Sequence, residues 1–296
     1  MHKITRKLKS VLLVWTIIVG APFIASALEG TLQKNIIFKS EILDQTVLYN
    51  VYLPSGYDES SGIFPVIFYL HWFGGDNNSA NDLITNLDAR MARKQFPDAV
   101  IIAPNAGICW YLDDYAGTYK YSSMFIREFI PHVNNKYKLT RNPQHRAIMG
   151  SSMGGFGALR FTMLNPNQFG ICISFMGGMS TKEQIVNDND EDYVTYHQNL
   201  YGDNLKDEDR ANDFFINNNP LYIAQQINPV VLKKIKWYIQ SCDEDYHSLP
   251  NAELHATFHK RGVKHEYRVN DGGHDGSCVE SSIEDALDFL RRNLNR

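Results

Sequence analysis

The feature that most constrains this chain is the run Gly150-Ser151-Ser152-Met153-Gly154, which places Ser152 at the centre of a Gly-x-Ser-x-Gly pattern. An apolar stretch of strand length, 145–149, precedes the pattern, and a segment with helical spacing, 155–164, follows it. A strand that turns into a helix within so few residues leaves room only for small side chains around the serine. The sequence therefore predicts a strand, a strained turn and a helix, with the serine hydroxyl pushed out of the sheet.

This arrangement is typical of the nucleophile elbow of serine hydrolases. The first backbone N–H groups of the helix, beginning with that of Met153, would lie beside the hydroxyl and hold a developing oxyanion. Three fixed positions in five also arise by chance, and the alternative is a glycine-rich turn that carries a surface serine. The strand before the turn and the helix after it favour the elbow.

Apolar runs of strand length alternate with helical segments, which predicts an α/β fold with a mostly parallel sheet covered by helices on both faces. The expected strands are a hairpin, 36–42 and 47–53, and then 65–70, 99–103, 145–149, 171–175, 237–241 and 265–269. The expected helices are 79–94, 122–137, 155–164, 251–261 and 280–293. In a chain of 296 residues this favours one domain over residues 28–296, because a single core can still reach that size.

The segment 180–226 breaks the alternation, because it is long and polar and contains runs of Asn and Asp. We interpret it as a cap-like insertion beside the site. A solvated loop excursion is the alternative.

Residues 1–27 predict a cleaved secretory leader. Four basic residues precede the apolar run 11–18, and Ala25-Ser26-Ala27 supplies the small residues that a signal peptidase recognises. The alternative is a retained membrane anchor, but Gly20 and Pro22 shorten the continuous apolar run. We therefore expect a secreted or periplasmic protein without stable membrane insertion after cleavage.

The charge balance excludes one class of partner. The chain carries 29 basic and 33 acidic residues, and loss of the four leader cations leaves 25 − 33 = −8. A surface this acidic argues against nucleic acid.

Four cysteines lack the C-x-x-C spacing of zinc sites, so no metal is expected. Export permits a disulfide, and a bridge between Cys242 and Cys278 is conceivable, with unpaired buried cysteines as the alternative.

A nucleophilic serine needs a base, and the base needs an orienting carboxylate. The segment Asp243-Glu244-Asp245 follows the expected strand 237–241, and His274 lies in a glycine-rich loop after strand 265–269. Open α/β sheets place their sites at these carboxyl ends, and the order serine, acid, histidine is that of α/β-hydrolases. His274 is the predicted base, whereas spacing alone does not choose among the three acids.

The loop 71–76 follows an early strand, and the N–H of Phe73 is the expected second oxyanion donor beside that of Met153. A tight turn with Trp72 in the core is the alternative. Trp72, Trp110 and Tyr111 are expected to bind substrate, and edge packing is the alternative for the last two.

With these pieces in order, the chain resembles the esterase D-like group of α/β-hydrolases, which includes S-formylglutathione hydrolases, tributyrin-type esterases, feruloyl and acetylxylan esterases, and mycolyltransferases. The resemblance covers about residues 34–294 and rests on Leu70-His71-x-x-Gly74-Gly75, Trp110-Tyr111, Gly150 to Ala158, Glu244-Asp245-Tyr246 and Gly272 to Asp275. The resemblance implies that Asp245 is the acid that orients His274, and Asp243 is the alternative. The family usually has glycine where Trp72 stands, which implies a narrowed acyl side of the pocket.

The expected protein is an exported serine carboxylesterase that hydrolyses short-chain or carbohydrate-linked acyl esters, of the acetyl or feruloyl type, through an acyl-enzyme. Neither a metal nor an organic cofactor is expected. Export disfavours glutathione thioesters as substrates. The alternatives are an acyltransferase of the mycolyltransferase type and a non-catalytic carbohydrate-binding protein with a hydrolase fold.

Overall fold

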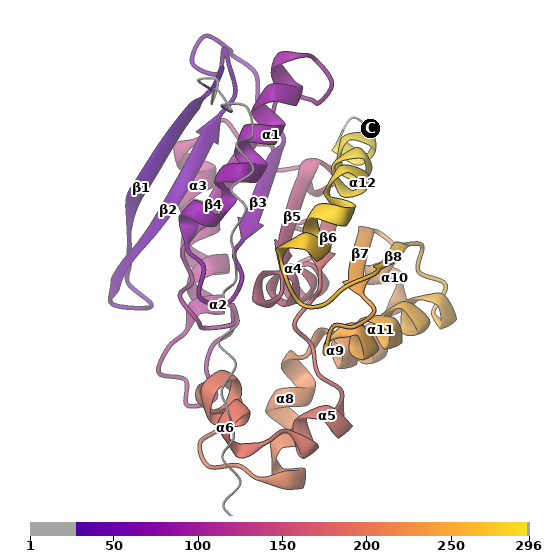
Figure 1. Ribbon diagram of the computed structural model, residues 1–296. Helices are drawn as coiled ribbons and strands as arrows, with labels where there is room; N and C mark the ends of the chain where they lie inside the picture. Colours follow the sequence, from indigo (N-terminus) through magenta and orange to yellow (C-terminus); the bar gives the residue numbers. More distant parts are fainter. Residues whose placement is uncertain (1–27, 295–296) are drawn as a thin grey trace, which may run out of the picture.

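A computed structural model describes residues 28–294, which form an eight-stranded sheet in the order β1-β2-β4-β3-β5-β6-β7-β8 (Figure 1). The strands are β1 Thr31–Ser40, β2 Gln45–Leu53, β3 Val66–Leu70, β4 Val100–Pro104, β5 Arg146–Ser151, β6 Ile171–Phe175, β7 Lys236–Cys242 and β8 Glu266–Asn270. β2 is antiparallel to both of its neighbours, and the pairs from β4 through to β8 are parallel. The predicted, mostly parallel sheet is confirmed. The leader predicted for residues 1–27 lies outside the described residues.

The helices follow the strands in alternation. They are α1 Asn81–Ala92, α2 Tyr121–Met124, α3 Ile130–Lys136, α4 Met153–Leu164, α5 Lys182–Asn187, α6 Asp190–Asp192, α7 Gln198–Tyr201, α8 Asp213–Asn218, α9 Pro220–Gln226, α10 Pro229–Leu232, α11 Ser248–Lys260 and α12 Gly276–Leu294. A π-helical turn, Phe125–Phe129, joins α2 to α3, and a second, Tyr193–His197, joins α6 to α7. Within residues 28–294, no helix has the length and apolarity that crossing a bilayer requires.

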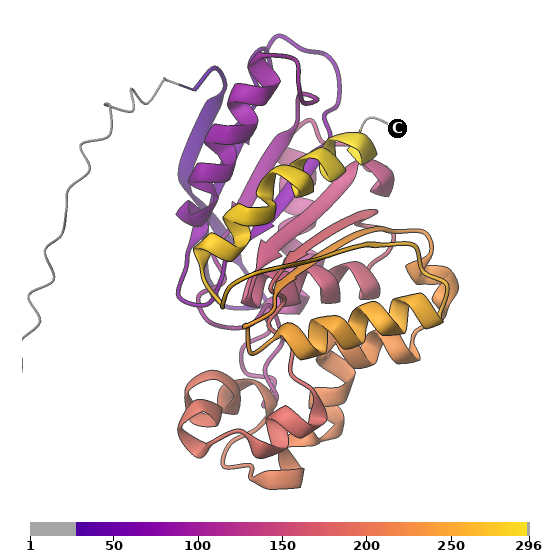
Figure 2. The ribbon, with the colours of Figure 1, turned by 45° about the vertical axis from the view of Figure 1, so that its right-hand side comes forward.

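Helices cover both faces of the sheet, as predicted. Figure 2 shows α1 and α12 together on one face, and α4 and α11 belong to the other. Because side chains alternate along a strand, Ile67 of β3 packs with the α1 and α12 side, whereas Phe68 packs with α4. The result is one buried layer on each face of a single sheet.

The first strand begins earlier than its apolar pattern indicates, at Thr31 rather than near residue 36. β1 lies at the edge of the sheet, and most of its first half is exposed. An edge strand with little buried surface gives a weak hydrophobic signal, which explains the missed residues.

The segment 180–226, called the cap below, is folded into the short helices α5 to α9, of which α5, α6 and α8 lie at the bottom of Figure 1. The alternative of a plain loop is therefore wrong. Its polar residues start helices: the side chains of Thr181, Asn189, Asn212 and Asn219 each accept a hydrogen bond from a backbone N–H in a first helical turn. Runs that resembled a solvated loop in the sequence are a series of helix N-caps.

Candidate active site

Ser152 lies on the turn between β5 and α4, with φ 54° and ψ −119°. This left-handed backbone conformation is unfavourable for a residue with a side chain, so the surrounding structure must hold it. The N–H of Ser152 donates to the carbonyl of Phe175 at 2.9 Å, and its own carbonyl accepts from Phe156 and Gly178, both at 3.0 Å. The turn is thus fixed on two sides.

Gly154 lets the elbow approach the end of β3. A Cβ at this position would lie 2.0 Å from the carbonyl oxygen of Leu70, a contact that no side chain permits. The first turn of α4 therefore sits directly against the point where the loop 71–76 begins. This contact brings the N–H of Met153, which as the first residue of a helix has no intrahelical acceptor, close to that loop.

The structure brings Ser152, Asp245 and His274 together. Nε2 of His274 lies 2.8 Å from Oγ of Ser152, and Nδ1 lies 2.9 Å from Oδ2 of Asp245. Since an ionised carboxylate only accepts hydrogen bonds, Nδ1 carries the ring proton and donates it to Asp245. Nε2 is then free to accept the hydrogen bond of the serine hydroxyl.

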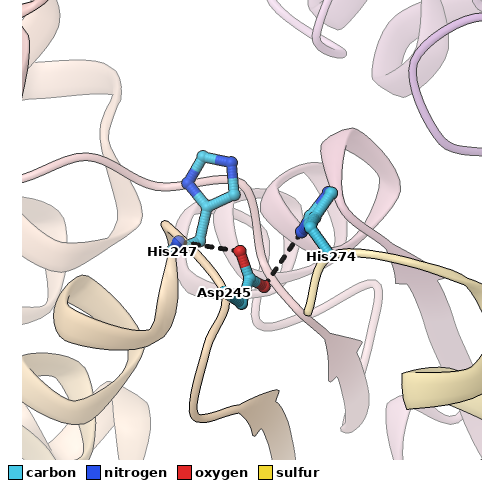
Figure 3. Close-up of side chains that lie close together, drawn as sticks. All are labelled: Asp245, His247 and His274. Atoms are coloured by element: carbon cyan, nitrogen blue, oxygen red, sulfur yellow. Dashed lines mark hydrogen bonds and ion pairs between the residues drawn. The ribbon is translucent and has the colours of Figure 1, made fainter. Parts of the chain in front are cut away.

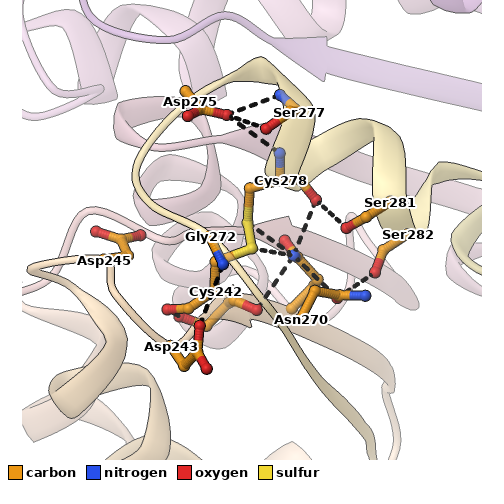
Figure 4. Close-up of a disulfide and its surroundings, with 12 residues drawn as sticks. Cys242, Asp243, Asp245, Asn270, Gly272, Asp275, Ser277, Cys278, Ser281 and Ser282 are labelled. Atoms are coloured by element: carbon orange, nitrogen blue, oxygen red, sulfur yellow. Dashed lines mark hydrogen bonds between the residues drawn. A yellow bond between two sulfur atoms is a disulfide. The ribbon is translucent and has the colours of Figure 1, made fainter.

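Asp245 is 5% exposed, and its second oxygen accepts from the backbone N–H of His247 at 2.8 Å. Burial alone would raise the pKa of this carboxyl, but the hydrogen bonds from His274 and His247 outweigh it and lower the pKa below its usual value. Asp243 instead accepts from the backbone N–H of Gly272 at 3.2 Å (Figure 4). The geometry thus places Asp245, and not Asp243, against the imidazole.

His247 is a site residue that the sequence analysis missed. Its ring lies edge-on to that of His274 with the centroids 5.1 Å apart (Figure 3). Its Nδ1 donates to the carbonyl of Met179 at 2.7 Å. Burial lowers the pKa of His247, which keeps the ring neutral beside His274. Its position just after Asp245 was the one available signal.

Asp245, His247 and His274 lie close enough together to offer ligand atoms to one metal ion. However, both ring nitrogens of His274 are engaged, one with Asp245 and the other with Ser152. An ion would have to displace one of these bonds. The observed contacts instead form a series in which His274 donates to Asp245 and accepts from the hydroxyl of Ser152.

A disulfide joins Cys242 to Cys278 across 36 residues (Figure 4). Cys242 ends β7 just before Asp245, and Cys278 lies in the first turn of α12 just after His274. The sequence alone did not decide whether these two cysteines are bridged. The bridge links the loop that carries Asp245 to the loop that carries His274. Cys109 and Cys172 are free.

The loop 71–76 is held by His71. Its Nδ1 donates to the carbonyl of Trp72 at 2.8 Å, and its Nε2 accepts from the backbone N–H of Ala106 at 2.9 Å. Burial lowers the pKa of His71, which maintains this neutral tautomer. The loop that carries the N–H of Phe73 is thereby fixed from within.

Ser152 and His274 open into a cavity of about 930 Å³ that is also lined by Trp72, Phe73 and Trp110. Tyr111 does not line it, so its assignment to substrate binding was wrong. The ring of Tyr111 is fully buried behind α4, where a Cβ on Gly157 would meet it at 2.7 Å, and its hydroxyl donates to the carbonyl of His71. Tyr111 supports the loop instead of touching a ligand.

The cap forms another wall of the same cavity. Asp188, Asp192, Tyr196 and His197 contribute to this lining. The ring of Tyr196 lies edge-on to Phe73 with the centroids 5.3 Å apart, which joins the cap to the loop 71–76. Beyond the position of the insertion, no sequence pattern indicated these four residues.

A mostly parallel sheet with a serine on the turn after β5, and an acid and a histidine after β7 and β8, defines the α/β-hydrolase fold. The model of the family described as putative esterases matches residues 40–289. The chain belongs to this family.

Solved structures agree with this fold. A ferulic acid esterase superposes with a TM-score of 0.75 at 24% identity, over 90% of this chain and 100% of its own. FphF of Staphylococcus aureus, a fluorophosphonate-binding serine hydrolase, superposes with a TM-score of 0.71 at 17% identity, over 88% of this chain and 98% of its own. At these identities the likeness shows the fold alone.

Curated relatives match part of the chain. The uncharacterized protein YbbA of Bacillus subtilis is 27% identical over 144 residues, or 44% of this chain and 56% of its own length. Esterase Rv1288 of Mycobacterium tuberculosis is 26% identical over 137 residues, or 45% of this chain and 29% of its own length. The matched regions thus span about half of the first relative and less than a third of the second.

Proposed function

We propose that the protein is an exported serine carboxylesterase that hydrolyses acyl esters of the short-chain or carbohydrate-linked type. The observation that carries the proposal is the continuous series from Ser152 Oγ to His274 Nε2, at 2.8 Å, and from His274 Nδ1 to Asp245 Oδ2, at 2.9 Å. Membership of the putative esterase family supports the same reaction class.

In the proposed reaction, Oγ of Ser152 attacks the ester carbonyl as Nε2 of His274 takes the hydroxyl proton. Asp245 keeps the imidazole in the required tautomer and stabilises the imidazolium. The N–H groups of Met153 and Phe73 are the proposed donors to the tetrahedral oxyanion. The intermediate collapses when His274 returns the proton to the leaving alcohol, and water then hydrolyses the acyl-enzyme by the same steps.

The cavity supports an acyl or alcohol group with a flat, apolar part. Trp72 and Trp110 both line it beside the serine. Trp72 is 42% exposed and Trp110 only 4%, so Trp72 is the ring that can stack on a sugar or phenyl ring, which suits carbohydrate-linked acetyl or feruloyl esters.

Export is supported by two independent features. Residues 1–27 have the order of basic, apolar and small residues of a secretory leader. The Cys242–Cys278 bridge also suits an oxidising compartment, where disulfides persist.

Ser152→Ala tests the proposed reaction, with Ser151→Ala, which removes the neighbouring hydroxyl, as the matched control. Ser152→Ala should abolish both hydrolysis of p-nitrophenyl acetate and labelling by a fluorophosphonate, with an unchanged circular dichroism spectrum. Ser151→Ala should keep both. Undiminished turnover by Ser152→Ala would refute the assignment. A panel of acetyl, butyryl and feruloyl esters then defines the acyl preference.

A further inference from the structure

The cavity above Ser152 has an unusual charge content. Five carboxylates contribute to its lining: Asp82, Asp188, Asp192, Asp275 and Glu280. Among the described residues that line it, none is a lysine or an arginine. An ester that enters this cavity therefore meets a negative field from several sides.

We propose that the site favours esters that carry an ammonium group and disfavours esters that carry an anionic one. This inference rests on the proposed esterase function and names the charge class of its substrates. It is carried by three features of the cavity: where the carboxylates lie, what aromatic surface accompanies them, and which polar atom in the wall lacks a partner.

The carboxylates lie on separate elements around the cavity. Asp188 and Asp192 come from the cap, Asp82 lies in the first turn of α1, and Asp275 precedes α12, directly after His274. Hydrogen bonds from Ser277 and Cys278 lower the pKa of Asp275, so it stays ionised in the range where an esterase works. A cation bound between these elements would face negative charge in several directions.

Arg210 is a buried cation of the cap, and its charge partly offsets the burial that raises the pKa of Asp188. Arg210 is paired with Asp190 and lies over the ring of Tyr193, 4.4 Å from its centroid. Neither Arg210 nor Asp190 lines the cavity. The arginine therefore offsets part of the charge of Asp188, but it presents no positive group to a ligand in the cavity.

Aromatic rings accompany the carboxylates. Trp72, Tyr196 and Tyr246 line the cavity and are 42%, 42% and 53% exposed. A ring face attracts a cation through its quadrupole, and a set of aromatic rings with nearby carboxylates is the usual surrounding of a bound quaternary ammonium. The same rings offer nothing specific to an anion.

A buried ring nitrogen in the cap wall is without a partner. His197 is 8% exposed and lines the cavity, and its Nδ1 has no hydrogen-bond partner among the described residues. Burial lowers the pKa of His197 to about 4, so the ring is neutral and does not oppose a cation. A neutral imidazole nitrogen accepts a hydrogen bond, which an ordered water or an ammonium that carries N–H groups can supply, whereas a quaternary ammonium would rely on the aromatic rings and the carboxylates alone.

The test compares esters that differ only in charge. Butyrylcholine, its neutral isostere 3,3-dimethylbutyl butyrate, and the butyrate ester of 2-hydroxyethanesulfonate form the alcohol-side set. A second pair, the methyl esters of 4-(trimethylammonio)butyrate and 5,5-dimethylhexanoate, places the cation on the acyl side. At about 10 mM salt, we expect kcat/KM for the cationic ester to exceed that for its neutral isostere by about tenfold in at least one set. At about 500 mM salt, this difference in kcat/KM should become smaller.

The outcomes distinguish a failure of the charge preference from a failure of the esterase function. Hydrolysis of the neutral esters with equal or lower kcat/KM for both cationic ones overturns the inference and leaves the esterase function in place. Absence of hydrolysis throughout overturns the function and the inference together. Preference for the sulfonate ester would also contradict the inference.

Variants locate the effect. Asp192→Asn removes a carboxylate of the cavity, and Glu191→Gln removes its neighbour, which does not line the cavity. Asp192→Asn should lower the ratio of cationic to neutral kcat/KM about threefold through KM, because surface carboxylates each contribute a small factor. Glu191→Gln should leave the ratio unchanged. The double variant Asp188→Asn/Asp192→Asn is the stronger test. If it still hydrolyses the neutral esters and keeps the wild-type ratio of cationic to neutral kcat/KM, the proposal that the cap carboxylates favour the cation is overturned.

Discussion

Nε2 of His274 lies 2.8 Å from Oγ of Ser152, although 122 residues of chain separate the two. β5, which ends before Ser152, and β8, which ends before His274, are not adjacent, since β6 and β7 lie between them. All four strands are parallel, so their carboxyl ends share one edge of the sheet. The short loops after β7 and β8, 243–247 and 271–275, can therefore carry Asp245 and His274 to the turn after β5.

Asp245→Asn should reduce kcat by a factor on the order of 10³ to 10⁴ without unfolding the protein. The amide offers its N–H to Nδ1 of His274 as readily as its oxygen, so the tautomer with Nε2 free for the serine is lost. Asp243→Asn is the matched control, because its carboxylate accepts from Gly272 and not from the histidine. Steady-state kinetics on p-nitrophenyl acetate measures both. Equal losses in the two variants would contradict the assignment of the acid.

The order of site residues along the chain was predictable, because each follows an apolar run that is long enough for a buried strand. The choice between Asp243 and Asp245 was not, because it depends on how the chain turns after β7. There the N–H of Asp243 donates to Asn270 and that of Glu244 to Gly272, so the first acid faces the next loop. Such contacts between distant segments leave no pattern in the sequence.

The same limit applies to the pocket walls. Trp110 and Tyr111 are adjacent aromatic residues with positive φ, yet only Trp110 lines the cavity. The side chains diverge because Gly157 leaves space for one ring beneath α4. In the cap, Tyr196 and His197 lie on a π-helical turn, and its spacing matches neither the helix nor the strand period.

Loss of the Cys242–Cys278 bridge should lower the free energy of unfolding by about 2–4 kcal/mol, because it closes a 36-residue span in the unfolded chain. Since the bridge also clamps the two site loops, kcat should fall several-fold. Urea unfolding and kinetics of Cys242→Ala/Cys278→Ala measure both effects. If the double variant does not fold, wild type with and without dithiothreitol replaces it. A wild-type midpoint that dithiothreitol leaves unchanged would contradict the prediction.

Gly154→Ala should destabilise the fold by at least about 3 kcal/mol, because the added methyl group would lie 2.0 Å from the carbonyl oxygen of Leu70. Gly273→Ala is the control, since a Cβ there meets nothing within 4 Å. Its free energy of unfolding should stay within about 1 kcal/mol of wild type. Urea unfolding compares the two, and loss of a cooperative transition in Gly154→Ala counts as agreement. Similar midpoints for the two variants would show that α4 does not press on β3.

Stability should fall in mild acid, and His197 should account for part of the fall. Burial lowers its pKa from 6.5 to about 4 in the folded protein, although Asp188 lies 3.7 Å from its Nε2. Between these two values the unfolded chain binds the extra proton and the folded chain does not. The free energy of unfolding therefore decreases as pH falls from about 6.5 and has lost the whole contribution of His197 below about 4.

His197→Phe removes this titration and keeps an aromatic ring against Trp110 and Tyr201. Urea unfolding from pH 7.5 down to 4.5 should show that the variant loses up to about 2–3 kcal/mol less stability than wild type. The two curves should be parallel above pH 7, where His197 is neutral in both states. Curves that stay parallel over the whole range would show that this ring is protonated as easily in the folded protein as in the unfolded chain.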